Sequence, residues 1–379
     1  MKKKLLFVIT QFYKGGAEVA LLNLFNALSC DEYEIDFLVF DQIVLKNATS
    51  LLPKVPKWIK VCNAAEKEGK AAILIKVLSK IIRKITKRQI YRIQAYNFIK
   101  RKKYDIAFSY GEWLSPEFIA KKVNAKEKYI WIHTDIDKAP YVDKNILFGY
   151  DSYYRGYIFV SENSKRSAEA KFKEVVGKSH IVHNMCEDEL IKILAEKEVP
   201  EVKKYKGPIL LTVGNLRDEK NHKRQIEVMN KLKKQGFDLT WINVGSTANV
   251  FLYQQLKHLV DKYNLQDDFI FLGADDNPYK FMKHADLVAV FSDFESWSLV
   301  ITEAKILGKP IVATKTSGAL EQIVDGETGI LVDFEIDSIV DKLQYYLKNM
   351  EQLNYIRNNL SNFSTYNNVI NEFDFIVKG

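Results

Sequence analysis

Cysteine and histidine are scarce in this chain. Among its 379 residues there are six histidines and three cysteines, and the cysteines, Cys30, Cys62 and Cys186, are widely spaced. An odd number of scattered cysteines argues against a disulfide framework and matches no spacing typical of a zinc site. We therefore expect a cytoplasmic protein, kept in a reducing compartment, that has no metal site.

Long apolar runs are also missing. No stretch of about 18 uninterrupted apolar residues occurs, so we expect no membrane-spanning helix. The start of the chain, MKKKLLFVIT, imitates a signal peptide, but the apolar run stops at Thr10 and no small-residue cleavage site follows. We interpret this segment as the first strand of a sheet.

Acidic residues are absent from one segment, 70–103, which holds twelve of the 56 lysines and arginines. The rest of the chain then has 44 basic residues against 48 acidic ones, so the formal net charge of +8 comes from this segment alone. Within it, KAAILIKVLSKIIRKITKR has apolar residues at helical spacing and basic residues largely on the other face, which predicts an amphipathic helix. The apolar positions are Ile73, Leu74, Val77, Leu78, Ile81, Ile82 and Ile85, and the basic ones are Lys76, Lys80, Arg83, Lys84 and Lys87.

This amphipathic helix has three interpretations. A core-facing helix with a solvated basic face is the plainest, but solvated faces usually mix charges of both signs. A helix of this type also binds at an anionic bilayer, where each basic residue adds about 1 kcal/mol. Nucleic-acid binding is disfavoured because no reading motif accompanies the basic patch. We therefore expect contact with an anionic membrane surface through 70–103 and no binding of nucleic acid.

The length of the chain and its 47% hydrophobic content suggest two domains, each with its own core. Short apolar runs alternate with longer amphipathic stretches, a pattern that predicts parallel sheets with crossover helices. The pattern restarts once. The expected strands are KLLFVIT, EIDFLVF, DIAFSY, KYIWIHT, GYIFVS and SHIVHN in the first half, and PILLTVG, LTWINVG, FIFLG, DLVAVFS, KPIVAT and GILVD in the second.

Two doubly wound, Rossmann-like domains follow from this pattern. We expect an N-terminal domain over 1–185 and a C-terminal domain over 207–362, joined by the charged segment 186–206. The end of the chain, 363–379, is a candidate helix that packs back on the N-terminal domain. Ligands of such sheets bind outside the carboxyl ends of the strands, so the expected site is the cleft between the two domains.

The segment 286–314, DLVAVFSDFESWSLVITEAKILGKPIVAT, carries the clearest chemistry. A buried strand should run into a loop that holds Glu295, and a helix that holds Glu303 should follow. The helix N-terminus near Ser298 and Leu299 should expose unpaired backbone N–H groups, which favour a phosphate. Carboxylates that accept from hydroxyls beside an anion site suit a nucleotide sugar, although two surface glutamates beside an ordinary helix would give the same pattern.

This block closely resembles the signature of the family-4 retaining glycosyltransferases, the group 1 type. Seven residues separate the two glutamates, and A-x-x-x-G-x-P-[IV]-V-A-T follows downstream. The likeness continues into SGALEQIVDGETGILV, where Ser317, Gly318, Glu321, Gly326 and Gly329 fall in the order typical of the family. The resemblance implies an α/β protein of the GT-B fold, with two Rossmann-like domains facing across a cleft.

The resemblance also assigns roles. Glu303 would hold the ribose hydroxyls of the donor, and Glu295 the hydroxyls of the donor sugar. His133, in HTDI at the end of an expected strand, resembles the histidine that faces the donor sugar from the N-terminal domain. Glu295 and His133 are therefore the expected catalytic residues, although a lone histidine at a strand end is more often structural.

Two turns complete the likeness. KGGAE, with Gly16 after the first strand, is similar to the N-terminal glycine loop of the family, although a plain turn before a helix would look the same. TVGNLRDEKNHKRQIEVM resembles the phosphate-binding turn, whose lysine falls on Lys220, but Asn215 stands where the family usually has arginine. An amide cannot replace a guanidinium as a bidentate phosphate clamp. Either Arg217 reaches back or Lys220 acts largely alone.

The resemblance implies a hexosyltransferase that moves a sugar from a nucleoside-diphosphate donor, UDP-sugar favoured, to a glycan acceptor with retention of configuration. A lipid-linked acceptor in bacterial surface polysaccharide synthesis, at the inner face of the cell membrane, fits best, and no metal or cofactor is required. Two alternatives remain. A sugar-nucleotide epimerase of the same architecture is disfavoured by the few histidines, and a non-catalytic sugar-nucleotide-binding protein by the presence of both glutamates.

Overall fold

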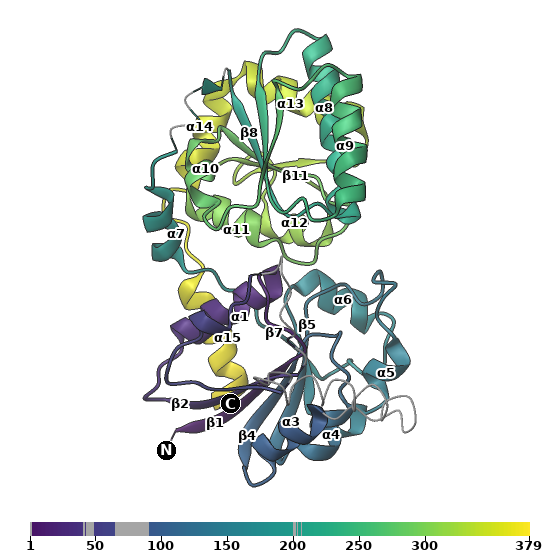
Figure 1. Ribbon diagram of the computed structural model, residues 1–379, viewed down its shortest axis with the longest axis vertical. Helices are drawn as coiled ribbons and strands as arrows, with labels where there is room; N and C mark the ends of the chain where they lie inside the picture. The colour runs from purple at the N-terminus through teal and green to yellow at the C-terminus, as the bar shows by residue number, and fades with distance from the viewer. Residues whose placement is uncertain are drawn as a thin grey trace, which may run out of the picture. The chain divides into compact units, whose positions relative to one another are not determined.

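The computed structural model describes residues 2–40, 42, 49–64, 91–199, 202, 204–205 and 207–379. The chain divides into two compact units: unit 1 consists of Met1–Met185 with Asn368–Gly379, and unit 2 of Cys186–Asn367. Each unit has its own parallel sheet with helices on both faces (Figure 1). The expected α/β fold with two Rossmann-like domains is confirmed.

The sheet of unit 1 has the strand order β3-β2-β1-β4-β5-β6-β7, and all of its paired strands are parallel. The order reverses between β1 and β4, so a crevice for a ligand is expected where these two strands end. Of these strands, only β3 is absent from the sequence prediction, because KVCN is short and half exposed at the edge of the sheet. The strands are β1 (Lys3–Ile9), β2 (Tyr33–Val39), β3 (Lys60–Asn63), β4 (Tyr104–Tyr110), β5 (Ala125–Ile132), β6 (Gly156–Phe159) and β7 (Ser179–Ile181).

Aromatic side chains fill one face of this sheet. Phe7 of β1 stacks on Phe108 of β4 with ring centroids 4.6 Å apart, and Phe25 of α1 and Phe373 of α15 pack on Phe7. Helix α15 (Tyr366–Lys378) therefore lies with α1 (Gly16–Ala27) on the sheet of unit 1 (Figure 1). The other face is covered by α3 (Tyr91–Ile99) and α4 (Glu117–Lys122), and the remaining helices of unit 1 are α5 (Lys144–Phe148) and α6 (Glu162–Glu169).

The sheet of unit 2 has the order β10-β9-β8-β11-β12-β13 and is also parallel. Its order reverses between β8 and β11, which makes the ends of these two strands the expected ligand position of unit 2. The strands are β8 (Ile209–Val213), β9 (Thr240–Val244), β10 (Phe269–Gly273), β11 (Leu287–Val290), β12 (Ile311–Thr314) and β13 (Ile330–Val332).

Helices α8, α9 and α13 lie on one side of this sheet, and α10 and α14 on the other (Figure 1). Helices α11 and α12 are the next helices after β11 and β12, and α11 is joined to β11 by the loop that holds Glu295. The helices are α8 (His222–Lys234), α9 (Val250–Lys262), α10 (Tyr279–His284), α11 (Leu299–Ile306), α12 (Ser317–Gln322), α13 (Ile336–Lys348) and α14 (Met350–Asn359).

The expected linker, 186–206, contains a helix, α7 (Asp188–Ala195). Cys186 and Ile191 are buried against Ile306 of α11, and Asp188 accepts hydrogen bonds from Ser364. The first part of this segment thus packs into unit 2.

The amphipathic helix expected over residues 70–90 lies outside the described residues. At the described end of the basic segment, Lys102 has an acidic partner: its Nζ lies 2.8 Å from the buried carboxylate of Asp36 on β2. The partner comes from a strand distant in sequence, which a count of local charges misses. Among the described helices, none combines the length and the apolarity that a membrane span requires.

Candidate functional site

The turn after β8 packs directly on the turn after β9. A Cβ on Gly245 would lie 1.8 Å from the carbonyl oxygen of Gly214, so this approach requires glycine. Asn215 is exposed, and its side-chain oxygen accepts a hydrogen bond from the N–H of Ser246 at 2.9 Å. Asn215 therefore joins the two turns by a hydrogen bond, whereas an arginine at this position would bind phosphate.

Lys220 and Glu295 meet at the ends of β8 and β11. The Nζ of Lys220 lies 2.6 Å from Oε1 of Glu295, and both side chains are largely buried. The N–H of Asp293 donates to the carbonyl of Glu219 at 2.8 Å, and the N–H of Gly318 donates to the carbonyl of Glu295 at 2.7 Å. These backbone bonds join the loops that carry the ion pair, so both charged groups are held where the strand order reverses.

Arg217 does not join this pair. Its side chain is 62% exposed and its nearest ion-pair contact is Glu219, at 3.7 Å. Sequence reasoning missed a different arginine, Arg224 in the first turn of α8, which donates to the carbonyl of Phe291 at 2.9 Å and to Asp293 at 2.8 Å. Arg224 thus fixes α8 to the end of β11. In the sequence, its place four residues after Lys220 could have indicated that it lies near the same turn.

The N-terminus of α11 is less open than the sequence suggests. The N–H of Ser298 donates to the side-chain oxygen of Gln322 at 2.9 Å, and the amide nitrogen of Gln322 donates back to the Ser298 carbonyl at 3.0 Å. The expectation of an unpaired N–H at Ser298 is therefore wrong, because α12 brings a side-chain acceptor to it. Leu299 is the first helical residue, and its N–H and the next two are the ones that lack an acceptor within the helix.

Glu303 is buried in α11 and is paired differently from Glu295. The hydroxyl of Tyr279 donates to Oε1 of Glu303 at 3.0 Å. Burial, and then the nearby Glu303 carboxylate, raise the pKa of Tyr279, so this hydroxyl keeps its proton as a donor. The two glutamates thus have separate partners: Glu295 faces a lysine, and Glu303 a tyrosine.

In unit 1, the glycine loop follows β1 and opens α1. Gly15 is the N-cap of α1, and Gly16 is its first residue. A Cβ on Gly16 would meet no atom within 4 Å, so packing within the described protein does not require glycine there. The hydroxyl of Tyr110, at the end of β4, donates to the carbonyl of Ala17 at 3.0 Å. The loop is thereby fixed to the end of the neighbouring strand, where the strand order reverses.

His133 follows the last residue of β5, as the sequence predicts. Its ring lies 4.5 Å from the ring of Tyr110 and 5.7 Å from that of Trp113, measured between centroids. Burial lowers the pKa of His133 to about 3, and the amide of Asn184 opposes this shift. Neither ring nitrogen has a hydrogen bond of acceptable geometry within the described structure. The ring is therefore a neutral, partly buried imidazole at neutral pH.

Glu112, two residues after the end of β4, is a candidate site residue that sequence reasoning missed. Its Oε2 accepts the backbone N–H of His133 at 2.9 Å, and the side chain is buried. Burial raises the pKa of Glu112 to about 7, although the hydrogen bonds from the N–H groups of His133 and of Glu112 itself lower it. The signal in the sequence is an acidic residue two positions after a buried strand, at the carboxyl edge where ligands bind.

We expect Glu112→Gln to gain stability relative to the wild type as the pH rises. The unfolded carboxyl group releases its proton near its ordinary pKa of 4.5, whereas the folded one holds it up to about 7. The free energy of unfolding of the wild type therefore decreases as the pH rises from 4.5 to 7, and the glutamine variant does not show this decrease. Urea unfolding should give a relative gain of about 2–3 kcal/mol from pH 5 to pH 8. If the free energies of unfolding of the two proteins differ by the same amount at every pH, the pKa of Glu112 is not raised.

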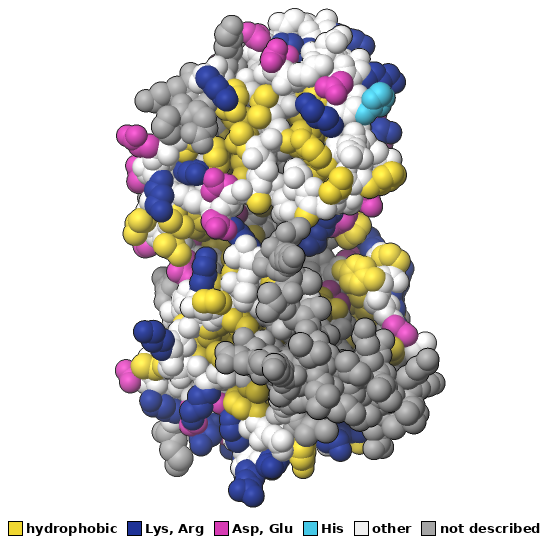
Figure 2. Space-filling view, in the orientation of Figure 1, with side chains coloured by type: hydrophobic (Ala, Val, Ile, Leu, Met, Phe, Trp, Pro, Cys, Tyr) yellow, Lys and Arg dark blue, Asp and Glu magenta, His cyan; other side chains and the backbone are white. Residues whose placement is uncertain are grey.

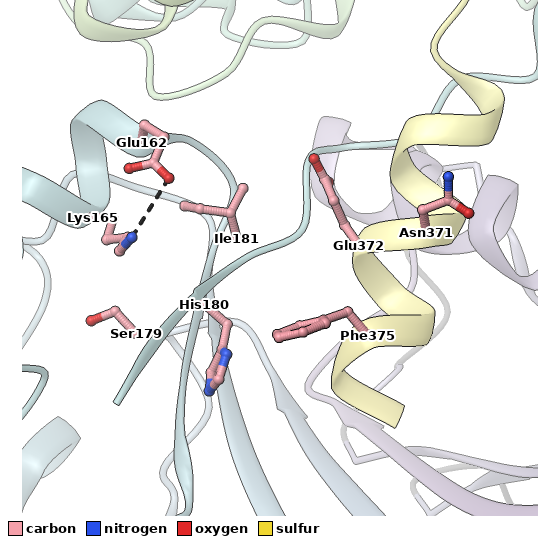
Figure 3. Close-up of a pocket in the computed structure, with 8 residues that line it drawn as sticks. All are labelled: Glu162, Lys165, Ser179, His180, Ile181, Asn371, Glu372 and Phe375. Carbon is pink, nitrogen blue, oxygen red and sulfur yellow. Dashed lines mark ion pairs between the residues drawn. The ribbon is translucent and has the colours of Figure 1, made fainter. Parts of the chain in front are cut away.

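A separate pocket of unit 1 lies beside the edge strand β7 (Figure 3). Glu162 and Lys165 of α6 form an ion pair at 3.5 Å on one side, and Glu372 and Phe375 of α15 lie on the other. No expected site residue lines it, and β7 is three strands from β4 in the sheet. This pocket is therefore distinct from the ends of β1 and β4.

Acidic, histidine and cysteine side chains form no cluster of three that could hold a metal ion within the part of the chain that the structure describes.

Known proteins resemble this chain in both sequence and fold. Residues 195–363 match the family described as glycosyl transferases group 1. Over 177 residues the chain is 32% identical to the N-acetylgalactosamine-N,N'-diacetylbacillosaminyl-diphospho-undecaprenol 4-alpha-N-acetylgalactosaminyltransferase of Campylobacter jejuni, an alignment that covers 46% of each protein. The chain spans about half the length of the curated relatives that it matches first.

The likeness to solved structures extends along the whole chain. A glycosyltransferase from Rickettsia africae has a TM-score of 0.74 at 19% identity, covering 100% of this chain and 98% of the other. Anabaena HepE, in complex with UDP, has a TM-score of 0.72 at 18% identity, covering 99% and 98%. At such identities the likeness shows the fold. The fold is therefore that of the GT-B glycosyltransferases, and residues 195–363 are the part of the chain that matches the group 1 glycosyl transferases.

Proposed function

We propose that this protein transfers a sugar from a nucleoside-diphosphate donor to a glycan acceptor, with retention of configuration. The observation that carries the proposal is the Lys220–Glu295 pair, held 2.6 Å apart at the ends of β8 and β11 inside the segment that matches the family. Without donor, Glu295 neutralises the ammonium group. A diphosphate would offer Lys220 a stronger counter-charge and free Glu295 to accept from sugar hydroxyls.

The proposed roles follow the resemblance. Lys220 and the N–H groups that begin at Leu299 stabilise the leaving diphosphate, where negative charge develops. Glu303 binds the ribose hydroxyls. His133 and the Gly16 loop of unit 1 take part in the same reaction, and the open space at Gly16 suits the close approach of a ligand to the backbone. We propose that transfer requires no metal and no covalent intermediate.

UDP is the proposed nucleotide, because structures with the same fold, those of Anabaena HepE, were determined with UDP and with UDP-glucose. A lipid-linked acceptor is proposed because the Campylobacter jejuni relative is named for a diphospho-undecaprenol substrate. Such an acceptor would place the protein on the inner face of the cell membrane, in the synthesis of a surface polysaccharide.

We also propose that residues 70–103 bind an anionic membrane. By the sequence, the unbalanced positive charge lies in this segment. On the face of unit 2 drawn in Figure 2, lysine and arginine side chains are interspersed with acidic ones. Binding to phosphatidylglycerol vesicles should be strong at low salt and reduced, but not lost, at high salt, since salt screens charge and not apolar insertion. Replacing Lys76, Lys80, Arg83 and Lys84 by glutamine should weaken it by about 1 kcal/mol per charge. A wild-type protein that ignores these vesicles at low salt would refute this proposal.

The experiment that tests the proposed function measures the release of free nucleoside diphosphate from a panel of nucleotide sugars, with and without a lipid-linked glycan acceptor. A transferase releases diphosphate rapidly only when both substrates are present. An epimerase would convert one nucleotide sugar into another without acceptor, and a binding protein would do neither. Product analysis by NMR gives the anomeric configuration, so inversion would contradict the retaining mechanism.

A further inference from the structure

Two buried polar side chains lie beside Lys220 without a role in the proposed function. His222, the first residue of α8, is 2% exposed, and Gln225 is fully buried one turn later. Both ring nitrogens of His222 and Oε1 of Gln225 lack a hydrogen-bond partner among the described residues. Both side chains line a pocket at the ends of β8 and β11, together with Gly214, Lys220 and Ser298.

Such unpaired groups are costly to the fold. A buried polar group without a hydrogen bond costs about 1–3 kcal/mol, and most buried polar groups in native proteins are paired. The rest of the buried face of α8 is apolar, with Ile226, Val228, Met229 and Leu232. A leucine at position 222 would continue this apolar face at lower cost. The polar side chain is therefore better explained by a ligand than by packing.

The charge state of His222 suits an anionic ligand beside a lysine. Burial, and then the positive charge of Lys220, lower the pKa of His222 to about 4. At neutral pH the ring thus presents one N–H donor without adding a second positive charge that would repel the ammonium group. Gln225 supports the same turn, because its amide nitrogen donates to the Lys220 carbonyl at 3.4 Å.

We propose that the ring of His222 donates a hydrogen bond to a phosphate oxygen of the bound nucleoside diphosphate, next to Lys220. This inference rests on the proposed function, since it adds one ligand to the donor site of that function. Neither Asn215 nor Arg217 is placed to bind the phosphate, because Asn215 accepts a hydrogen bond from Ser246 and Arg217 lies near Glu219. His222, at the start of α8, would supply a hydrogen-bond donor in their place.

The test compares His222→Leu and His222→Gln with the wild type in two measurements, the affinity for UDP by calorimetry and the melting temperature without ligand. His222→Leu should bind UDP about tenfold more weakly, the loss expected for one hydrogen bond to a charged group, while its melting temperature stays the same or rises. His222→Gln keeps an N–H donor and should retain part of the affinity. His258→Leu, at an exposed histidine of α9, is the matched control and should change neither quantity.

The outcomes separate this inference from the proposed function. Equal UDP affinity in the wild type and in His222→Leu would overturn this inference and leave the proposed function standing. If the melting temperature of His222→Leu also falls at unchanged affinity, His222 serves packing. If the wild type binds none of UDP, GDP, ADP and inorganic pyrophosphate, the donor site itself is wrong and the proposed function fails with it.

Discussion

Glu303→Ala will abolish sugar transfer mainly by weakening donor binding. A carboxylate has about four acceptor positions, so the bond from Tyr279 leaves capacity for both ribose hydroxyls. If Glu303 holds the ribose as proposed, its removal leaves both hydroxyls without their acceptor, and hydrogen bonds to a charged group contribute about 1.5–3 kcal/mol each. Calorimetry should therefore give a loss of UDP affinity of about 100-fold or more, at about 1.4 kcal/mol per tenfold.

Two further variants separate binding from folding. Glu303→Ala also leaves the Tyr279 hydroxyl without this acceptor, whereas Glu303→Gln keeps an oxygen for it and removes the charge. The glutamine variant should fold like the wild type and still bind UDP poorly. Glu351→Ala, at an exposed carboxylate of α14, is the matched control. Unchanged nucleotide affinity in a folded Glu303 variant would show that this residue does not hold the ribose.

Lys220→Ala will cost more activity than Arg217→Ala. Lys220 is largely buried and bonded to Glu295, so its loss removes the charge that we propose for the diphosphate and leaves the Glu295 carboxylate without this ion-pair partner. Arg217 is mostly solvent-exposed, and an exposed ion pair such as its contact with Glu219 contributes about 0–1 kcal/mol. We expect kcat/KM to fall about 100-fold or more for Lys220→Ala and less than about fivefold for Arg217→Ala.

The comparison of Lys220→Ala with Arg217→Ala also tests which residue binds the phosphate in place of the arginine that Asn215 replaces. Glu295→Gln should retain UDP binding better than Lys220→Ala, because it removes the counter-charge and leaves the ammonium group. If Arg217→Ala proves the more damaging change, Arg217 moves to the phosphates when donor binds and takes the place that Asn215 vacates. Equal losses in the two variants would contradict a site built around Lys220.

Motifs and strands were predictable because their signals are local. Runs such as KLLFVIT and PILLTVG are short, apolar and rich in β-branched residues, and they form β1 and β8. The positions of His133 after β5 and of Leu299 at the start of α11 also follow from the order of elements along the chain. The α7 helix in the expected linker shows the limit of this approach, since its apolar residues pack on α10 and α11, which are distant in sequence.

The sequence alone determined the two-domain α/β organisation, the resemblance to the group 1 glycosyltransferases and the residues that stand at the ends of the strands, since each depends on neighbours in the chain. The tertiary structure decided which of these side chains are paired. Lys220 meets Glu295 across 75 residues, Gln322 occupies the Ser298 N–H from α12, and Glu112 binds the backbone of His133 across the sheet. Such pairs form because parallel strands bring their carboxyl ends to one edge, whatever their separation in sequence. Burial near the carboxyl edges of the two sheets then shifts the pKa values of Glu112, His133 and His222, and no local sequence pattern predicts these shifts.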